Sequence, residues 1–81
     1  MASESLTGKL GAEILKSLFQ EDFSCVEARI QEAFEYGLDK TKLFEMLLCE
    51  HFKEIKKCGD MQLKVTAVRN ALRALSYLEG K

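Results

Sequence analysis

Cys49, His51 and Cys58 are the side chains in this sequence best suited to bind a metal ion or to attack a substrate. Thiolate and imidazole groups are common zinc ligands, and a thiol beside an imidazole can act as a nucleophile. If their segment is a helix, Cys49 and His51 point about 160° apart, because each residue turns the helix by ~100°. His51 and Cys58 then share a face but lie roughly 10 Å apart along the axis, whereas zinc holds its ligands at about 2.0–2.3 Å. We therefore predict no metal site and no cofactor.

Cys25, from an earlier segment, leaves two alternatives open. Placed beside His51, it would supply a further metal ligand or form a Cys–His pair, and an unwound helix would also bring the later thiols closer. The sequence indicates no oxyanion hole, no glycine-rich phosphate loop and no motif of paired carboxylates. We predict that the protein is not an enzyme and has no catalytic residue, and no small-molecule substrate is evident.

The composition predicts one small helical domain over residues 1–81, with residues 1–4 as an N-terminal tail. A hydrophobic content of 47% is too high for a disordered chain, and the absence of proline favours helix. Twelve basic and 13 acidic residues give a net charge of −1, which provides no electrostatic basis for nonspecific nucleic-acid binding. Nucleic acid is therefore not the expected partner.

The three cysteines are an odd number, so they do not imply a closed disulfide framework. We interpret them as buried, small apolar residues in a reducing compartment. No signal peptide is visible, and no uncharged run approaches the ~20 residues that span a membrane. These observations predict a cytoplasmic protein without a membrane association.

Leucine and isoleucine recur every four residues in the first predicted helix, which runs from about Ser5 to Gln20. Gly8 and Gly11 lie inside it, and each costs up to ~1 kcal/mol relative to alanine. Their spacing would also admit a close helix neighbour.

The second predicted helix has a capping box at its start, because Ser24 is followed three residues later by Glu27. Gly37 is the predicted stop, since glycine adopts the left-handed conformation without steric strain. Leu38 is placed for the apolar contact that accompanies such a stop.

Asp39 and Asp60 are predicted N-caps of the last two helices. The third helix should end near Cys58, and the fourth should run from about Met61 to Glu79. The fourth shows an apolar stripe at helical spacing, which we expect to be buried: Met61, Val65, Val68, Ala71, Leu72, Leu75 and Leu78. The predicted fold is a compact all-α domain of four helices, built from two helical hairpins with short connections.

The segment from Arg29 to Leu48 resembles the helix-turn-helix of DNA-binding regulators. Small, glycine and apolar residues occupy the matching positions, namely Ala33, Gly37, Leu38, Leu43 and Met46. The resemblance implies a DNA-binding transcriptional regulator as the alternative function. The would-be recognition helix, however, presents few groups that read bases or phosphates, since its expected surface is Phe44, Glu45, Leu47 and Leu48. Lys40 and Lys42 are the basic residues near its start.

The third predicted helix carries more apolar surface than one stripe of roughly 100° requires. We expect part of this surface to bind another protein, with contacts from Phe44, Leu47, Leu48, His51, Phe52 and Ile55. A wholly internal helix is the alternative explanation. His51 is either a partly buried residue with one hydrogen bond or a pH-sensitive contact.

Arg69 and Arg73 are four residues apart on the fourth predicted helix. Such a pair can contact an acidic partner or a phosphate, or can simply form the solvated face of the helix. Together with the apolar surplus, it predicts a non-catalytic protein–protein interaction module, such as an adaptor, small chaperone, inhibitor or regulatory subunit. A homodimer is the first partner that we expect.

Overall fold

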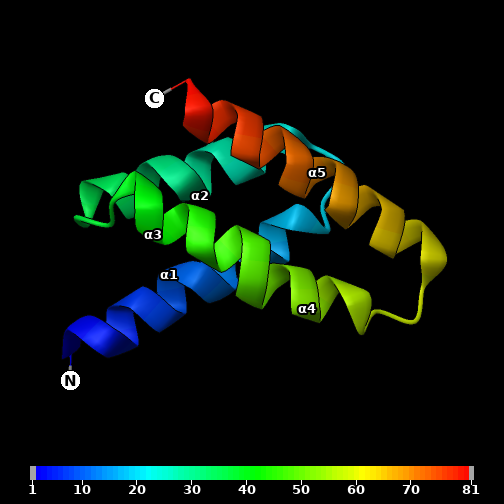
Figure 1. Cartoon of the computed structure of the whole chain (residues 1–81), viewed down its shortest axis with the longest axis horizontal. Helices are drawn as coiled ribbons and strands as arrows, with labels where there is room; N and C mark the ends of the chain where they lie inside the picture. The colour runs from blue at the N-terminus through cyan, green and yellow to red at the C-terminus, as the bar shows by residue number, and fades with distance from the viewer. Residues whose placement is uncertain (1, 81) are drawn as a thin grey trace.

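The computed structural model of the chain describes residues 2–80, with side chains from residue 8 onward. This part of the chain is all-α, as predicted (Figure 1). The elements are α1 (Ala2–Leu18), α2 (Phe23–Glu35), α3 (Lys40–Glu45), η1 (Met46–His51), α4 (Phe52–Lys56) and α5 (Met61–Glu79). Because α3, η1 and α4 follow one another without a break, they form one continuous helix, which we call the long helix. Four-residue connections at 19–22, 36–39 and 57–60 join the resulting four helices.

The first helix begins at Ala2, so it includes residues that the sequence assigns to an N-terminal tail, while Met1 lies outside the described residues. It ends at Leu18, two residues before the predicted end. A contact with α5, distant in the sequence, stabilises this end of α1. The Asn70 amide of α5 donates to the carbonyl oxygens of Leu18 (2.8 Å) and Gln20 (2.6 Å), and so satisfies carbonyls that a helix end leaves unpaired.

The cap of α2 differs from the prediction. Asp22, not Ser24, is the N-cap, and its Oδ1 accepts hydrogen bonds from the Ser24 backbone N–H (3.0 Å) and hydroxyl (2.8 Å). The helix begins two residues earlier than the capping box requires, because Phe23 is already buried in the core. The Ser24 hydroxyl therefore stabilises the cap as a donor instead of being the cap.

The predicted stop at Gly37 and the predicted caps at Asp39 and Asp60 are confirmed. Gly37 has a φ of +96°, and the Leu38 N–H donates to the Ala33 carbonyl, as in a Schellman motif. The Asp39 side chain accepts from the Lys42 N–H, and the Asp60 side chain accepts from two N–H groups at the start of α5. These aspartates end both connections in the same way.

The long helix contains a π-helical turn at η1, which the sequence did not indicate. Four of its five buried side chains follow one another every four residues and form what we call the inner row: Leu43, Leu47, His51 and Ile55. In a regular α-helix, each four-residue step overshoots a full turn by roughly 40°, so the fourth member of such a row would leave the core. A π turn has more residues per turn, which reduces this overshoot and keeps the whole row buried.

The buried face of α5 agrees with the predicted stripe only at Ala71 and Leu78. It consists mainly of alanine, with Ala67, Asn70, Ala71, Ala74 and Leu78 inside. Met61, Val65 and Leu72 of the predicted stripe are exposed, whereas Val68 and Leu75 are half-buried. Small side chains allow α5 to approach the other helices closely, so the larger apolar row lies on its flank.

Candidate protein-binding surface

His51 is buried and held by α1. Its Nε2 lies 2.9 Å from the Gly11 carbonyl oxygen, so Nε2 carries the proton and donates it. Nδ1 is buried and has no hydrogen-bond partner among the described residues. Burial lowers the pKa of His51, although the hydrogen bond to Gly11 and the charge of Glu50 oppose this shift. The ring is therefore neutral at pH 7 and serves as a structural contact between the long helix and α1.

The cysteines do not behave as predicted. All three are free thiols, but Cys25 and Cys49 are exposed and Cys58 is half-buried, so none is a core residue. Cys25 and His51 are not brought together, because the thiol lies on the surface and the imidazole in the interior. Among the side chains that the structure describes, those of residues 8–80, no group of three or more potential ligands is placed to hold a metal ion.

The structure divides the six residues of the predicted binding surface into two groups. Leu47, His51 and Ile55 belong to the inner row and are core residues of this chain. The others form an outer row on the same helix, in which Phe44 is half-buried, Phe52 is 40% exposed and Leu48 is 57% exposed. Only the outer row can reach a partner without unfolding the domain.

Helix α5 exposes apolar residues that we had expected to be buried. Val65 is 48% exposed and Leu72 is 60% exposed, with Val68 and Leu75 half-buried beside them. The signal was present in the sequence, because α5 carries a row of alanines next to its row of larger apolar residues. Periodicity alone does not say which of two neighbouring apolar rows faces the core.

One flank of α5 contacts α2. The Arg73 guanidinium lies 4.3 Å from the centre of the Phe23 ring, and the Gln31 side chain donates to the Tyr77 hydroxyl. At ~100° per residue, Val68 and Leu75 lie on the opposite flank. That flank faces the long helix, which α5 contacts along both α3 and α4, in addition to its contacts with α1 and α2.

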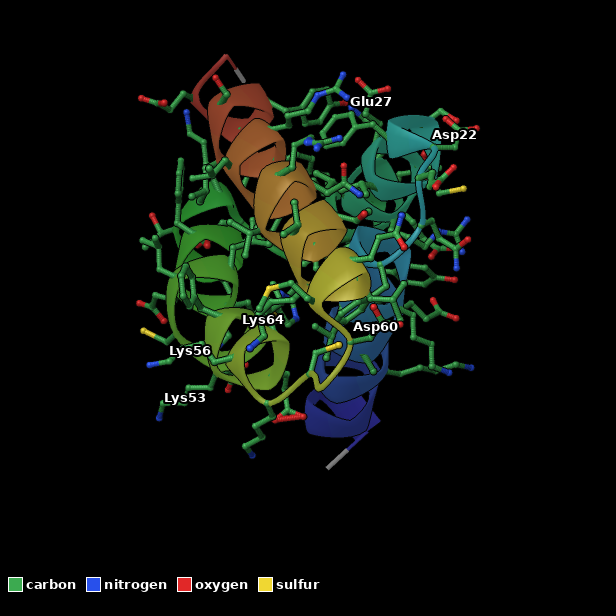
Figure 2. The ribbon with its side chains drawn as sticks, turned by 90° about the vertical axis from the view of Figure 1, so that its right-hand side faces the viewer. Asp22, Glu27, Lys53, Lys56, Asp60 and Lys64 are labelled. Atoms are coloured by element: carbon green, nitrogen blue, oxygen red, sulfur yellow. The ribbon has the colours of Figure 1, made fainter. Side chains whose placement is uncertain are left out.

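The long helix also has one flank against one neighbour and the opposite flank against another. Met46 lies against α1, where its sulfur would be 3.3 Å from a Cβ added at Gly11. The outer row lies on the other side of the inner row from Met46, away from α1 and next to α5. The two exposed rows therefore adjoin, and we call their combination the outer apolar face: Phe44, Leu48, Phe52, Val65, Val68, Leu72 and Leu75. Figure 2 looks onto the end of the molecule where the connection 57–60 joins α4 of the long helix to α5.

Arg69 and Arg73 are both exposed but have different surroundings. Arg73 is engaged in the cation–π contact with Phe23, which holds α5 against α2. Arg69 is exposed and borders the outer apolar face near Val65 and Leu72.

No protein-family model, curated protein or solved structure matches this chain. Among the described residues, no helix is both long and apolar enough to cross a bilayer. The outer apolar face is therefore the feature of the molecule that bears on its function.

Proposed function

We propose that the protein is a non-catalytic interaction module that binds another protein through its outer apolar face. The observation that carries this proposal is the exposure of large apolar side chains on two adjoining helices, above all Leu48 and Leu72. Monomeric domains rarely expose contiguous apolar patches, and such patches commonly mark interaction sites. Burial of apolar area contributes roughly 25 cal/mol per Å², so a few anchors can dominate affinity.

Two features bear on the type of module and on its location. The titratable groups that could have formed a catalytic site are separated, with His51 neutral and inside while two thiols are outside. The three unpaired thiols suit a reducing compartment, so we place the protein in the cytoplasm. A role as adaptor, small chaperone, inhibitor or regulatory subunit is consistent with a surface that binds without reacting.

The test compares proteins that co-purify with the wild-type chain and with the double variant Leu48→Ser/Leu72→Ser. We expect the double variant to lose its partner while retaining its helical circular dichroism spectrum, because both residues are already exposed. Tyr36→Ser is the matched control, since Tyr36 is 59% exposed but lies at the end of α2, outside the outer apolar face. An identical set of co-purifying proteins in all three samples would count against the proposal.

Light scattering on the same samples tests the predicted homodimer and the predicted alternative. A wild-type mass of twice 9.2 kDa that the double variant halves would identify a second copy as the partner. Retention on DNA at about 150 mM salt, unchanged in the double variant, would instead favour the helix-turn-helix regulator.

A further inference from the structure

Charge is unevenly distributed along the chain. Residues 1–51 contain five basic and ten acidic residues, a net charge of −5, whereas residues 52–81 contain seven basic and three acidic residues, a net charge of +4. The second region includes α4 and α5, which supply most of the outer apolar face. A near-neutral molecule thus presents most of its outer apolar face on the part of the chain that is net positive.

Three lysines mark one end of the outer apolar face. Lys56 follows Phe52 at four-residue spacing on α4, and Lys64 precedes Val68 at the same spacing on α5. Figure 2 shows Lys53, Lys56 and Lys64 together at the end of the two helices where the connection 57–60 joins them. The apolar rows therefore continue into a cluster of positive charge.

These lysines are available to a partner. Lys57 is held by Glu54 (3.1 Å), but Lys53, Lys56 and Lys64 form no ion pair with any described side chain. Asp60 lies at the same end, where its carboxylate accepts hydrogen bonds from the backbone N–H groups of Gln62 and Leu63 in the first turn of α5. The three lysines thus keep unneutralised charge next to exposed apolar surface.

Building on the proposed function, we infer that the partner segment is an acidic amphipathic helix, with its apolar stripe on the outer apolar face and its carboxylates against Lys53, Lys56 and Lys64. A helix presents anchors every three or four residues, which matches the spacing of Phe44, Leu48 and Phe52. A strand-like partner would need an exposed sheet edge, and residues 2–80 contain no strand.

The same charges disfavour two other occupants. Five basic residues (Lys40, Lys53, Lys56, Lys64 and Arg69) and three acidic ones (Glu45, Asp60 and Glu79) lie on or beside the two exposed rows. Two copies placed face to face would bring two net positive surfaces together. An anionic membrane suits the charge, but Phe44, Val68 and Leu75 are half-buried between the helices and cannot insert deeply, and the chain has no tryptophan.

The experiment uses three synthetic peptides of about 20 residues, long enough for a stable amphipathic stripe. The first has leucines at helical spacing flanked by glutamates, the second has the same leucines flanked by lysines, and the third has the glutamates with serine in place of leucine. We expect the whole chain to bind the first peptide in a fluorescence anisotropy titration, and to bind the other two at least about tenfold more weakly.

The matched variants separate charge from apolar contact. The triple variant Lys53→Gln/Lys56→Gln/Lys64→Gln should weaken binding of the acidic peptide by about tenfold and reduce its salt dependence. The control removes the same charge from exposed lysines elsewhere, with Lys9→Gln, Lys16→Gln and Lys42→Gln, and should leave binding unchanged.

The outcomes distinguish this inference from the proposed function. Equal affinity for the acidic and basic peptides, both abolished by Leu48→Ser/Leu72→Ser, would overturn the acidic partner and leave an apolar binding surface standing. Binding to phosphatidylserine vesicles without binding to the acidic peptide would overturn the inference in favour of a membrane surface. Absence of binding to every peptide would also overturn it, whereas the proposed function would then depend on whether that double variant changes the co-purifying proteins.

Discussion

The inner and outer rows of the long helix are of similar composition and lie one residue apart in the sequence, yet their surroundings are opposite. Leu47 and Ile55 are buried in the hydrophobic core of the domain, while Leu48 and Phe52 are exposed on the same helix. The same contrast recurs on α5, where alanines fill the core and larger residues lie outside. The contrast shows that in this small domain residue type does not separate core from surface, and that the packing partner does.

The largest expected difference in stability is between truncating a residue of the inner row and truncating one of the outer row. Ile55→Ala should lower the free energy of unfolding by about 2–5 kcal/mol, because Ile55 is fully buried and its loss leaves a cavity. Leu48→Ala should change it by less than about 0.5 kcal/mol. Urea denaturation followed by circular dichroism measures both, and Ile55→Val, expected to lose about 0.5–1.5 kcal/mol, serves if the alanine variant does not fold. Equal losses from the two rows would invalidate the contrast.

The two glycines of α1 test what positions the inner row. Gly11→Val should destabilise the domain by about 1–3 kcal/mol, because its side chain would press on Met46 and on the His51 contact. Gly8→Ala has open space around its added Cβ and should gain up to about 1 kcal/mol from helix propensity. Thermal unfolding of both variants should show a lower midpoint for Gly11→Val and a higher one for Gly8→Ala. A stabilising Gly11→Val would show that α1 and the long helix are not in close contact at this position.

Asn70 is the polar member of the alanine row. Asn70→Ala should cost about 1–3 kcal/mol, because two carbonyl oxygens at the end of α1 lose their donor. Arg69→Ala, one residue away and exposed, is the control and should be nearly neutral. Hydrogen exchange should also show faster opening of the last turn of α1 in the Asn70 variant only. If both variants unfold at the same urea concentration, Asn70 does not hold α1.

The smallest expected effect is the pH dependence of the inner row. Because burial lowers the pKa of His51 below its usual value of 6.5, the unfolded chain takes up the proton first as the pH falls. Stability from His51 is therefore complete above pH 6.5 and is lost as the pH falls from 6.5 to the lower pKa of the folded state. Urea midpoints at about pH 8 and about pH 5.5 should differ for the wild type and differ less for His51→Gln, whose amide can still donate to Gly11. The same difference in both proteins would assign the pH effect to other groups.

The sequence predicted much of the fold from local chemistry. Gly37 stops α2 because its φ of +96° suits glycine, and Asp39 and Asp60 cap the next helices with their own carboxylates. The cap of α2 was wrong by two residues, because Asp22 and Ser24 both offer an oxygen and only the burial of Phe23 places the start of the helix. Phe44, Leu48 and Phe52 were selected as binding residues from apolar surplus alone, and the other half of the outer apolar face was not.

By itself, therefore, the sequence determined the number, type and approximate ends of the helices, since turns, caps and periodicity act within a few residues. Only the tertiary structure decided which apolar row became core. The close approach of α5 selected its alanines, the π turn kept His51 and Ile55 aligned with Leu43, and Gly11 admitted Met46 beside them. Which residues are buried therefore depends on packing between residues far apart in the chain, and a local sequence pattern does not reveal that packing.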